Sequence, residues 1–146
     1  FFTKVLNELT LGLIDEDEEI NIPADRDYWL KRGTRATVEE VDELFKIVQS
    51  IAPGYKLKYN KYYIGLEKGG VTNNFVYFKP KKQFTTIESR MPENEELKTE
   101  LEEAGLDIEF TSKWSLFVIR LRSGEVEKNK EVLEKFIQTA FEASQR

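Results

Sequence analysis

The chain has 146 residues, and its 22 lysines and arginines stand against 27 aspartates and glutamates, which gives a net charge of −5. It contains no histidine and no cysteine, which excludes histidine-based acid–base catalysis, Ser-His-Asp and Cys-His triads, ordinary zinc sites and disulfides. The lack of cysteine fits a reducing compartment, and no apolar run approaches the ~20 residues that span a bilayer. We therefore expect a cytoplasmic protein with no membrane partner.

The first 35 residues differ in character from the rest of the chain. Apolar residues at positions 2, 5, 6, 9 and 13 have the i, i+3, i+4 spacing of an amphipathic helix, which we expect over residues 1–13. Five consecutive acids follow at 15–19, and Pro23 bounds them. This run is read as a solvated linker; a metal-attracting loop and a nucleic-acid mimic that shields a basic face stay open.

We therefore predict two parts, an N-terminal helical segment with an acidic linker at 1–35 and an α+β domain at 36–146. The chain begins at Phe1 rather than at methionine, and we expect it to be part of a longer protein. An upstream domain of the same chain is accordingly one expected partner.

The pattern from residue 25 onward alternates between helical and strand periodicity. Asp25 can cap a short helical turn at 27–30, and Thr37 with Glu40 forms a capping box for a helix at 37–52 that Pro53 and Gly54 end. The spacing then predicts strands at 56–59, 62–66, 74–79 and 84–90, a helix at 92–104, strands at 108–110 and 114–122, and a closing helix at 125–143.

This order predicts an α+β fold of two layers, because runs of strands separated by short turns pair as an antiparallel meander. We expect a sheet of about four to six strands, with helices packed on one face. The helices at 37–52 and 125–143 would cover that face, and the other face would be at least partly open.

The charges are sorted along the chain. Residues 54–90 carry eight lysines and arginines against two acids, a local charge of +6, whereas 1–53 carry −6 and 91–146 carry −5. Eight tyrosines and phenylalanines also fall within 54–90. A cationic and aromatic strand region between acidic helical regions indicates a surface that meets an anionic partner.

Alternation along the strands assigns the candidate contacts of that surface. Lysines and arginines neutralise phosphates, and exposed tyrosine rings stack on unpaired bases at about 1–3 kcal/mol each. The predicted nucleic-acid or anion-binding residues are Lys56, Lys58, Tyr63, Tyr77, Lys79, Lys81, Lys82, Arg90, Arg120 and Arg122.

Two other interpretations of the same residues stay open. The sheet face can be an ordinary solvated face, with its lysines lying over apolar neighbours. The acidic segments can also pair with the basic sheet, within the domain or across a homodimer, for example residues 15–19 with Lys81 and Lys82. In that case the domain is a protein-interaction or oligomerisation module that binds no nucleic acid.

The sequence gives no convincing catalytic motif, so we expect the domain not to be an enzyme. Glu96 and Lys98 form a Glu-x-Lys pattern, but on a predicted helix, and Gly69-Gly70 is a hairpin turn rather than a phosphate loop. Asp107 and Glu109 share one side of a short strand, from which they could reach a metal together with Glu88. We predict no catalytic residues, no metal ligands and no cofactor.

Two stretches carry a resemblance to a known family: 58–66, reading KYNKYYIGL, and 73–82, reading NNFVYFKPKK. With the end of the helix at 101–106, the strand at 114–121 and the closing helix, the chain resembles an uncharacterised prokaryotic domain, the domain of unknown function 5655 type. The resemblance covers about residues 37–143. It implies a C-terminal accessory module, of a kind sometimes found behind nuclease-like or restriction-like domains, and it carries no functional residues over.

Overall fold

The computed structural model describes residues 23–145. The helix expected at 1–13 and the acidic run at 15–19 lie outside the described residues. The described helices are α2 (Arg26–Arg32), α3 (Arg35–Ile51), α4 (Glu95–Glu103), α5 (Glu125–Lys128) and α6 (Lys130–Ser144). The strands are β1 (Tyr55–Tyr59), β2 (Ile64–Lys68), β3 (Val71–Thr72), β4 (Tyr77–Pro80), β5 (Thr85–Arg90), β6 (Asp107–Thr111) and β7 (Leu116–Leu121).

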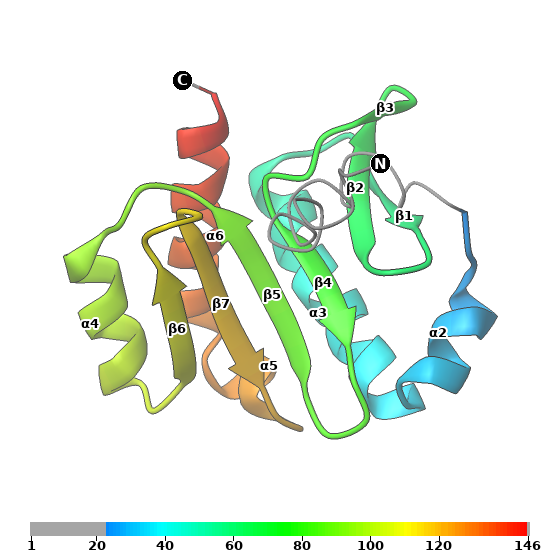
Figure 1. Ribbon diagram of the computed structural model, residues 1–146, viewed down its shortest axis with the longest axis horizontal. Helices are drawn as coiled ribbons and strands as arrows, with labels where there is room; N and C mark the ends of the chain where they lie inside the picture. Colours follow the sequence, from blue (N-terminus) through cyan, green and yellow to red (C-terminus); the bar gives the residue numbers. More distant parts are fainter. Residues whose placement is uncertain (1–22, 146) are drawn as a thin grey trace, which may run out of the picture.

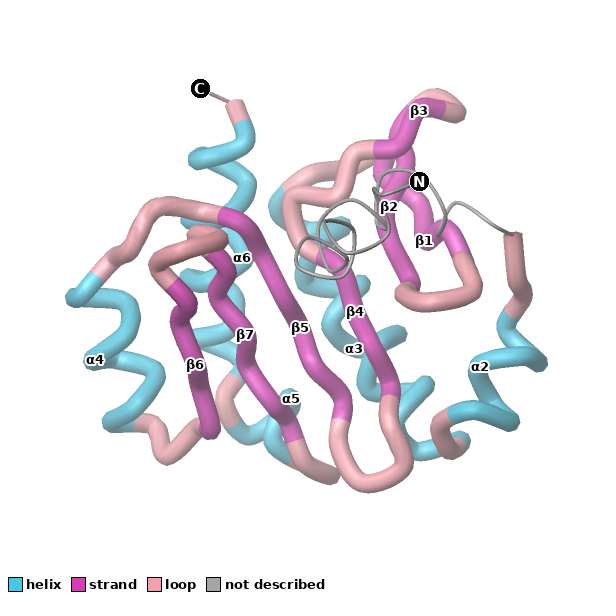
Figure 2. The backbone as a smooth tube through the Cα atoms, in the orientation of Figure 1, coloured by secondary structure: helices cyan, strands magenta, loops and turns pink. Residues whose placement is uncertain are grey.

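The strands form one antiparallel sheet in the order β1-β2-β4-β5-β7-β6, with the two-residue β3 paired to β2. This confirms the expected α+β fold with an antiparallel sheet, and the short β3 brings the number of strands to seven. The chain runs from β1 to β5 as a meander and then inserts α4 before β6 and β7 (Figure 2).

Helices α3 and α6 lie together behind the sheet, as the sequence predicted, and α4 runs beside the β6 edge (Figure 1). The core between these layers is apolar, because every second residue of each central strand faces the helices. Phe78, Ile87 and Ile119 are register partners on neighbouring strands, and each is fully buried. We call this side the helix-covered face, and we call the opposite side, on which none of the helices of residues 23–145 packs, the helix-free face.

The N-cap of helix α3 lies three residues earlier than the capping pattern predicts. Thr34 is the N-cap, and its side-chain oxygen accepts from the backbone of Thr37, whose own hydroxyl accepts in return from the Thr34 N–H. The predicted box instead placed Thr37 at the cap and Glu40 three residues on. A threonine at N3 therefore takes the place of the usual Glu or Gln in this capping box.

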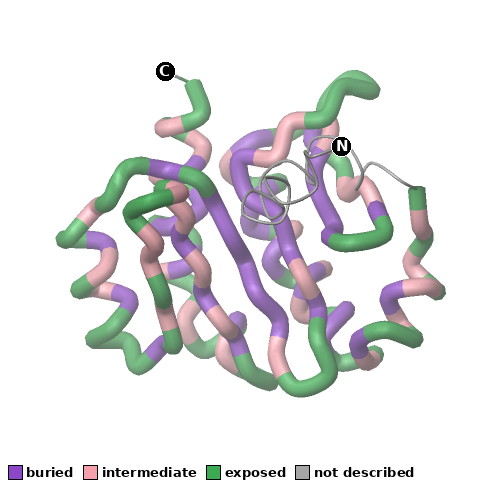
Figure 3. Tube along the Cα trace, viewed as in Figure 1, coloured by how far each residue is buried: buried purple, intermediate pink, exposed green. Residues whose placement is uncertain are grey.

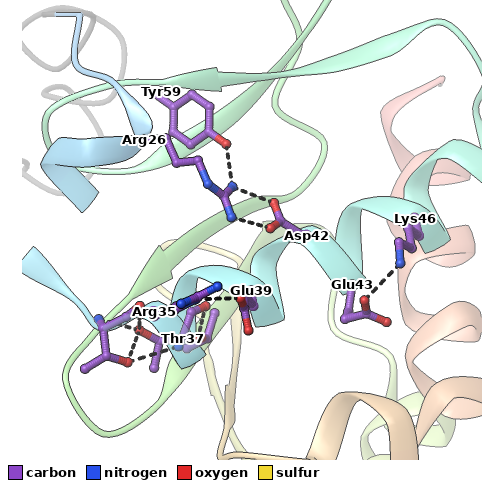
Figure 4. A network of polar contacts seen from close by, with 10 residues as sticks. Arg26, Arg35, Thr37, Glu39, Asp42, Glu43, Lys46 and Tyr59 are labelled. Carbon is purple, nitrogen blue, oxygen red and sulfur yellow. Dashed lines mark hydrogen bonds and ion pairs between the residues drawn. The ribbon is translucent and has the colours of Figure 1, made fainter. Parts of the chain in front are cut away.

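Helix α2 packs on α3 and on the end of β1, so the described part of the 1–35 segment belongs to the same core. Trp29 is buried, and its indole N–H donates to the Asn60 carbonyl at 2.8 Å. The Arg26 guanidinium forms a two-pronged contact with the Asp42 carboxylate on α3, at 3.0 and 2.7 Å (Figure 4). The Tyr59 hydroxyl is a further partner of Arg26.

The turn between β2 and β3 is the predicted glycine pair. Gly69 and Gly70 have φ of 61° and 82°, which matches the two positive φ values of a type I′ hairpin turn. The sequence had placed the returning strand at 74–79. The structure instead returns first through β3 and then through a loop, so β4 begins only at Tyr77.

The predicted closing helix is divided into two pieces. Gly124 is the N-cap of α5, and Asn129 interrupts the helical pattern before α6 begins. The Asn129 side chain donates to the Glu125 carbonyl at 3.0 Å, which satisfies a carbonyl at the break. No helix among residues 23–145 combines the length and apolar character needed to cross a membrane.

Candidate anion-binding surface

Strand register places the predicted cations of β1, β4 and β7 on the helix-free face, as their alternation indicated. Lys79 is the register partner of Thr86, which in turn pairs with Arg120. These three residues flank the Phe78–Ile87–Ile119 row of the core and therefore project to the other side. By the same alternation Lys58, opposite Gly65 and next to the core residue Leu57, lies on the helix-free face.

At the β6–β7 edge the cations are neutralised by neighbouring acids. Arg120 contacts Glu109 at 2.7 Å and Asp107 at 3.5 Å, and Arg122 lies 3.9 Å from Asp107. The hydrogen bond to Glu109 raises the pKa of Arg120 most, and both carboxylates add to the shift. We call these four residues the paired edge.

The middle of the helix-free face contains a buried carboxylate. Glu88 accepts from the Thr86 hydroxyl at 2.9 Å, and its other oxygen lies 3.5 Å from the Lys79 ammonium. The Glu88 side chain is 8% exposed, against 28% for Lys79. A buried carboxylate needs such partners, because removal from water disfavours its charged form. Glu88 is thereby held as a structural counter-ion.

At the opposite end of the face, the β4–β5 turn meets the end of α2, and cations gather there. Gly33, the C-cap of α2, lies against this turn: a side-chain carbon in its place would lie 3.0 Å from the Pro80 carbonyl oxygen. The gathered residues, which we call the basic corner, are Arg32, Lys79, Lys81 and Lys82. Within residues 23–145 only Lys79 of these four forms an ion pair, with Glu88.

Lys82 is held in place by backbone carbonyls. Its ammonium donates to the carbonyl oxygens of Lys31 and Gly33, at 2.9 and 3.0 Å. These carbonyls lie at the end of α2, where helix carbonyls lack intrahelical partners and a cation is favourable. Lys82 therefore connects two segments that are far apart in sequence, and its charge remains part of the basic corner.

The pKa of Lys81 is lowered by its surroundings. Burial lowers its pKa most, the nearby Lys79 and Arg32 lower it further, and Glu88 acts in the opposite direction. A lysine whose charged form is disfavoured by like charges is a place where an arriving anion gains electrostatic energy. The arrangement can bind an anion.

The two tyrosines predicted to stack on bases are buried. Tyr63 is 1% exposed and Tyr77 3% exposed, and their rings meet edge to face with centroids 5.5 Å apart. The half-buried Leu116 packs against them. In this packing neither ring presents a free face to a base, so the stacking role remains a prediction that requires rearrangement of this face.

The remaining predicted residues lie apart from the basic corner. Lys56 and Lys58 are on the edge strand β1, and the Lys58 ammonium donates to the Thr72 hydroxyl at 3.2 Å. Arg90 is exposed at the end of β5. The structure thus brings together Lys79, Lys81 and Lys82, and it leaves the other predicted cations in separate positions.

Sequence reasoning missed Arg32. The Arg32 guanidinium carbon lies 5.5 Å from the Trp29 ring centroid and 6.0 Å from the rings of Tyr28 and Tyr62. Tyr62 is 41% exposed, so it is the accessible aromatic residue of this cluster. The signal was present as adjacent basic residues in the last turn of a short helix, but it fell within a segment whose net charge is negative.

The three carboxylates considered as metal ligands form ion pairs with basic side chains instead. Asp107 and Glu109 contact Arg120, and Glu88 contacts Lys79. Within the described residues 23–145 no group of three or more acidic, histidine or cysteine side chains could hold a metal ion. One open depression beside α2 has a mixed lining of Asp25, Asp27, Tyr28, Lys31 and Arg32.

Comparison of the chain with protein-family models, with curated proteins and with solved structures gives no match. The resemblance to the domain of unknown function 5655 type therefore stays a prediction.

Proposed function

We propose that this chain is a non-catalytic binding module that holds a polyanion, with nucleic acid as the first candidate, at its basic corner. The observation that carries this proposal is the convergence of four cations from α2, β4 and the β4–β5 turn, with Glu88 as the one ion-pair partner among residues 23–145. Phosphate oxygens would supply the missing negative charge and release condensed counter-ions.

The exposed aromatic Tyr62 supports the same partner. It lies beside both Lys61 and Arg32, whose cationic groups are 5.6 and 6.0 Å from its ring centroid. A cation next to an accessible ring is a combination that can contact a phosphate and an unpaired base together. The proposal therefore favours single-stranded over double-stranded nucleic acid.

The resemblance adds a context to this proposal. An accessory module behind a nuclease-like domain would hold or orient nucleic acid while the upstream domain performs the chemistry. The proposal requires only binding from the described residues, and it assigns no catalytic group to them.

The test is a titration of the whole chain with labelled single-stranded and double-stranded DNA and RNA at about 50 and 200 mM salt. The Lys79→Gln/Lys81→Gln variant should bind about tenfold more weakly, with a salt slope shallower by about 2, since each lost phosphate contact removes roughly one unit. Lys82 is left unchanged because its ammonium holds the end of α2.

The matched control is Lys128→Gln/Lys130→Gln, which removes the same charge from two exposed lysines at the α5–α6 break. Equal loss in both variants would show a response to net charge alone and would contradict a site at the basic corner. If the wild-type chain binds no nucleic acid at the lower salt concentration, nucleic acid is eliminated. A protein-interaction or oligomerisation role then becomes the leading function.

A further inference from the structure

Two contacts hold Arg32 in position, and they use only one nitrogen of its guanidinium. Its Nη1 donates to the Tyr28 hydroxyl at 2.7 Å and to the Lys61 carbonyl at 3.1 Å. Within residues 23–145 its Nε and Nη2 have no hydrogen-bond partner. The edge of the guanidinium formed by Nε and Nη2 is therefore available for two parallel hydrogen bonds to a phosphate.

Further donors lie across the contact between α2 and the β4–β5 turn. The Lys82 ammonium donates to two backbone carbonyls at the end of α2, which leaves one of its three N–H groups for another acceptor. Lys81 is close enough to Arg32 for their charges to interact. Arg32 and residues 81–83 are exposed, so these donors are accessible to a ligand from solvent (Figure 3).

We propose that the basic corner selects the terminal phosphate of a single-stranded nucleic acid over the phosphates within the strand. The proposal rests on polyanion binding at the corner and adds which part of the polyanion is recognised. A terminal phosphate carries a charge of about −1.5 to −2 and three acceptor oxygens, whereas a phosphate within the strand carries a single charge. Arg32 can bind two of these oxygens, and a lysine ammonium can bind the third.

The charges on the other side of Arg32 oppose a strand that continues past it. The open depression beside α2 contains Asp25, Asp27 and Lys31 next to Arg32. Once a phosphate neutralises Arg32, two carboxylates and one ammonium remain there, so a further phosphate would be repelled. We therefore expect the strand to end at the corner. Its terminal base would lie on Tyr62, the accessible ring whose centroid is 6.0 Å from the Arg32 guanidinium carbon.

The test is competition by unlabelled oligonucleotides of one sequence against a labelled single strand bound to the full chain. The competitors carry a phosphate at either end, hydroxyls at both ends, or a terminal phosphate methyl ester, which keeps the size of the group but lacks its second charge. We expect a phosphorylated end to strengthen competition about tenfold over the hydroxyl-ended strand. The methyl ester should compete nearly as the hydroxyl-ended strand does.

The pH dependence of competition is a second readout, and the chain has no histidine to titrate in the same range. The second ionisation of a terminal phosphate has a pKa of about 6. Lowering the pH from about 7.5 to about 5.5 should therefore remove most of the advantage of the phosphorylated strand, measured as a ratio to the hydroxyl-ended strand at each pH. An advantage that does not change with pH would contradict recognition of the second charge.

Two variants locate the recognition. Arg32→Lys keeps the charge but removes the fork, so the advantage of the phosphorylated end should fall to less than about threefold. Arg122→Lys, the same change at the paired edge, is the matched control and should keep the full advantage. Because Arg32 also contacts Tyr28, Lys81→Gln serves as a second variant that leaves this contact in place, and it should reduce the advantage as well.

The possible results separate this proposal from polyanion binding itself. Equal competition by all strands would overturn selection of a terminal phosphate and leave polyanion binding intact, whereas failure of every strand to bind would overturn both. Competition by a free nucleoside monophosphate at the same concentration as the phosphorylated strand would identify a mononucleotide as the ligand and would overturn recognition of a strand. An equal loss in Arg32→Lys and Arg122→Lys would contradict a site at the basic corner.

Discussion

The two ends of the helix-free face differ in how their cations are balanced by acidic side chains. At the paired edge, Arg120 is held by Glu109 and Asp107, and its pKa is raised because its charged form is stabilised. At the basic corner, Lys81 lies near Lys79 and Arg32, and its pKa is lowered by burial and like charge. The count of cations in the sequence therefore measures binding capacity poorly. What matters is which cations already have acidic partners.

The largest expected effect on stability comes from a substitution at the contact between α2 and the β4–β5 turn. In Gly33→Ala the new methyl group would lie 2.9 Å from the Thr37 hydroxyl, 3.0 Å from the Pro80 carbonyl and 3.3 Å from the Lys81 carbonyl. The φ of Gly33 is −98°, so the cost arises from crowding rather than from backbone strain. We expect a loss of about 1–3 kcal/mol of unfolding free energy, measured by urea denaturation.

The control for Gly33→Ala is Gln83→Ala, an exposed residue of the same turn, which should change stability by less than about 0.5 kcal/mol. The Gly33 variant should also bind polyanions more weakly, since α2 and the β4–β5 turn separate. Unchanged stability and affinity would show that this contact does not position the basic corner.

At the paired edge, Arg120→Gln removes the shared cation of two carboxylates. We expect stability to fall by about 0.5–1 kcal/mol, a modest amount because the Asp107 and Glu109 side chains are 44% and 55% exposed and water screens them. Thermal unfolding in low and high salt is the measurement. The deficit should shrink as salt rises, and a deficit that is independent of salt would indicate lost packing instead of lost charge.

At the basic corner, removal of a positive charge should instead raise the stability of the fold. Lys81→Met removes a charge that the fold disfavours, so stability should rise slightly, by less than about 0.5 kcal/mol, while polyanion affinity falls. A variant that loses both stability and affinity would refute the contrast between the two ends of the face.

The pH dependence of Lys81 provides a further check. Because its pKa is lowered on folding, the unfolded chain holds the proton more tightly, and raising the pH toward 10.5 removes an unfavourable charge from the folded state. Wild type should therefore gain stability relative to Lys81→Met over that pH window. Chemical denaturation at a series of pH values measures this difference, and parallel pH profiles for the two proteins would argue against it.

The sequence predicted most of the fold because the relevant signals are local. The apolar stripes of α3 and α6 and the alternation around Phe78, Ile87 and Ile119 were sufficient to identify the helix-covered face. Helix ends were less predictable, since a threonine pair at positions 34 and 37 formed a capping box without the acidic residue the pattern expects.

The candidate surface was only partly predictable, because pairing depends on distant contacts. Alternation placed Lys79 and Arg120 on one face. It could not show that Arg120 has a close acidic partner at 2.7 Å, whereas the acidic partner of Lys79 lies at 3.5 Å. Nor does any pattern indicate that Lys82 reaches a carbonyl 51 residues away, or that Arg32 adjoins Lys81. These contacts arise because α2 packs against the β4–β5 turn, and local sequence periodicity does not predict that packing.

The join between β2 and β4 gives the sheet a built-in line of weakness. Their ladder contains the single register pair Ile64–Phe78, and beyond it the Asn74 side chain takes the place of a strand, accepting from the Leu66 N–H at 2.7 Å and donating to the Tyr63 hydroxyl at 3.1 Å. A seam with one register pair and few backbone hydrogen bonds opens more readily than a continuous ladder. In amide hydrogen exchange, β1, β2 and β3 should therefore exchange early as one unit, while β5 and β7 remain protected. The protein would then unfold first by local detachment of this hairpin, before the rest of the sheet unfolds.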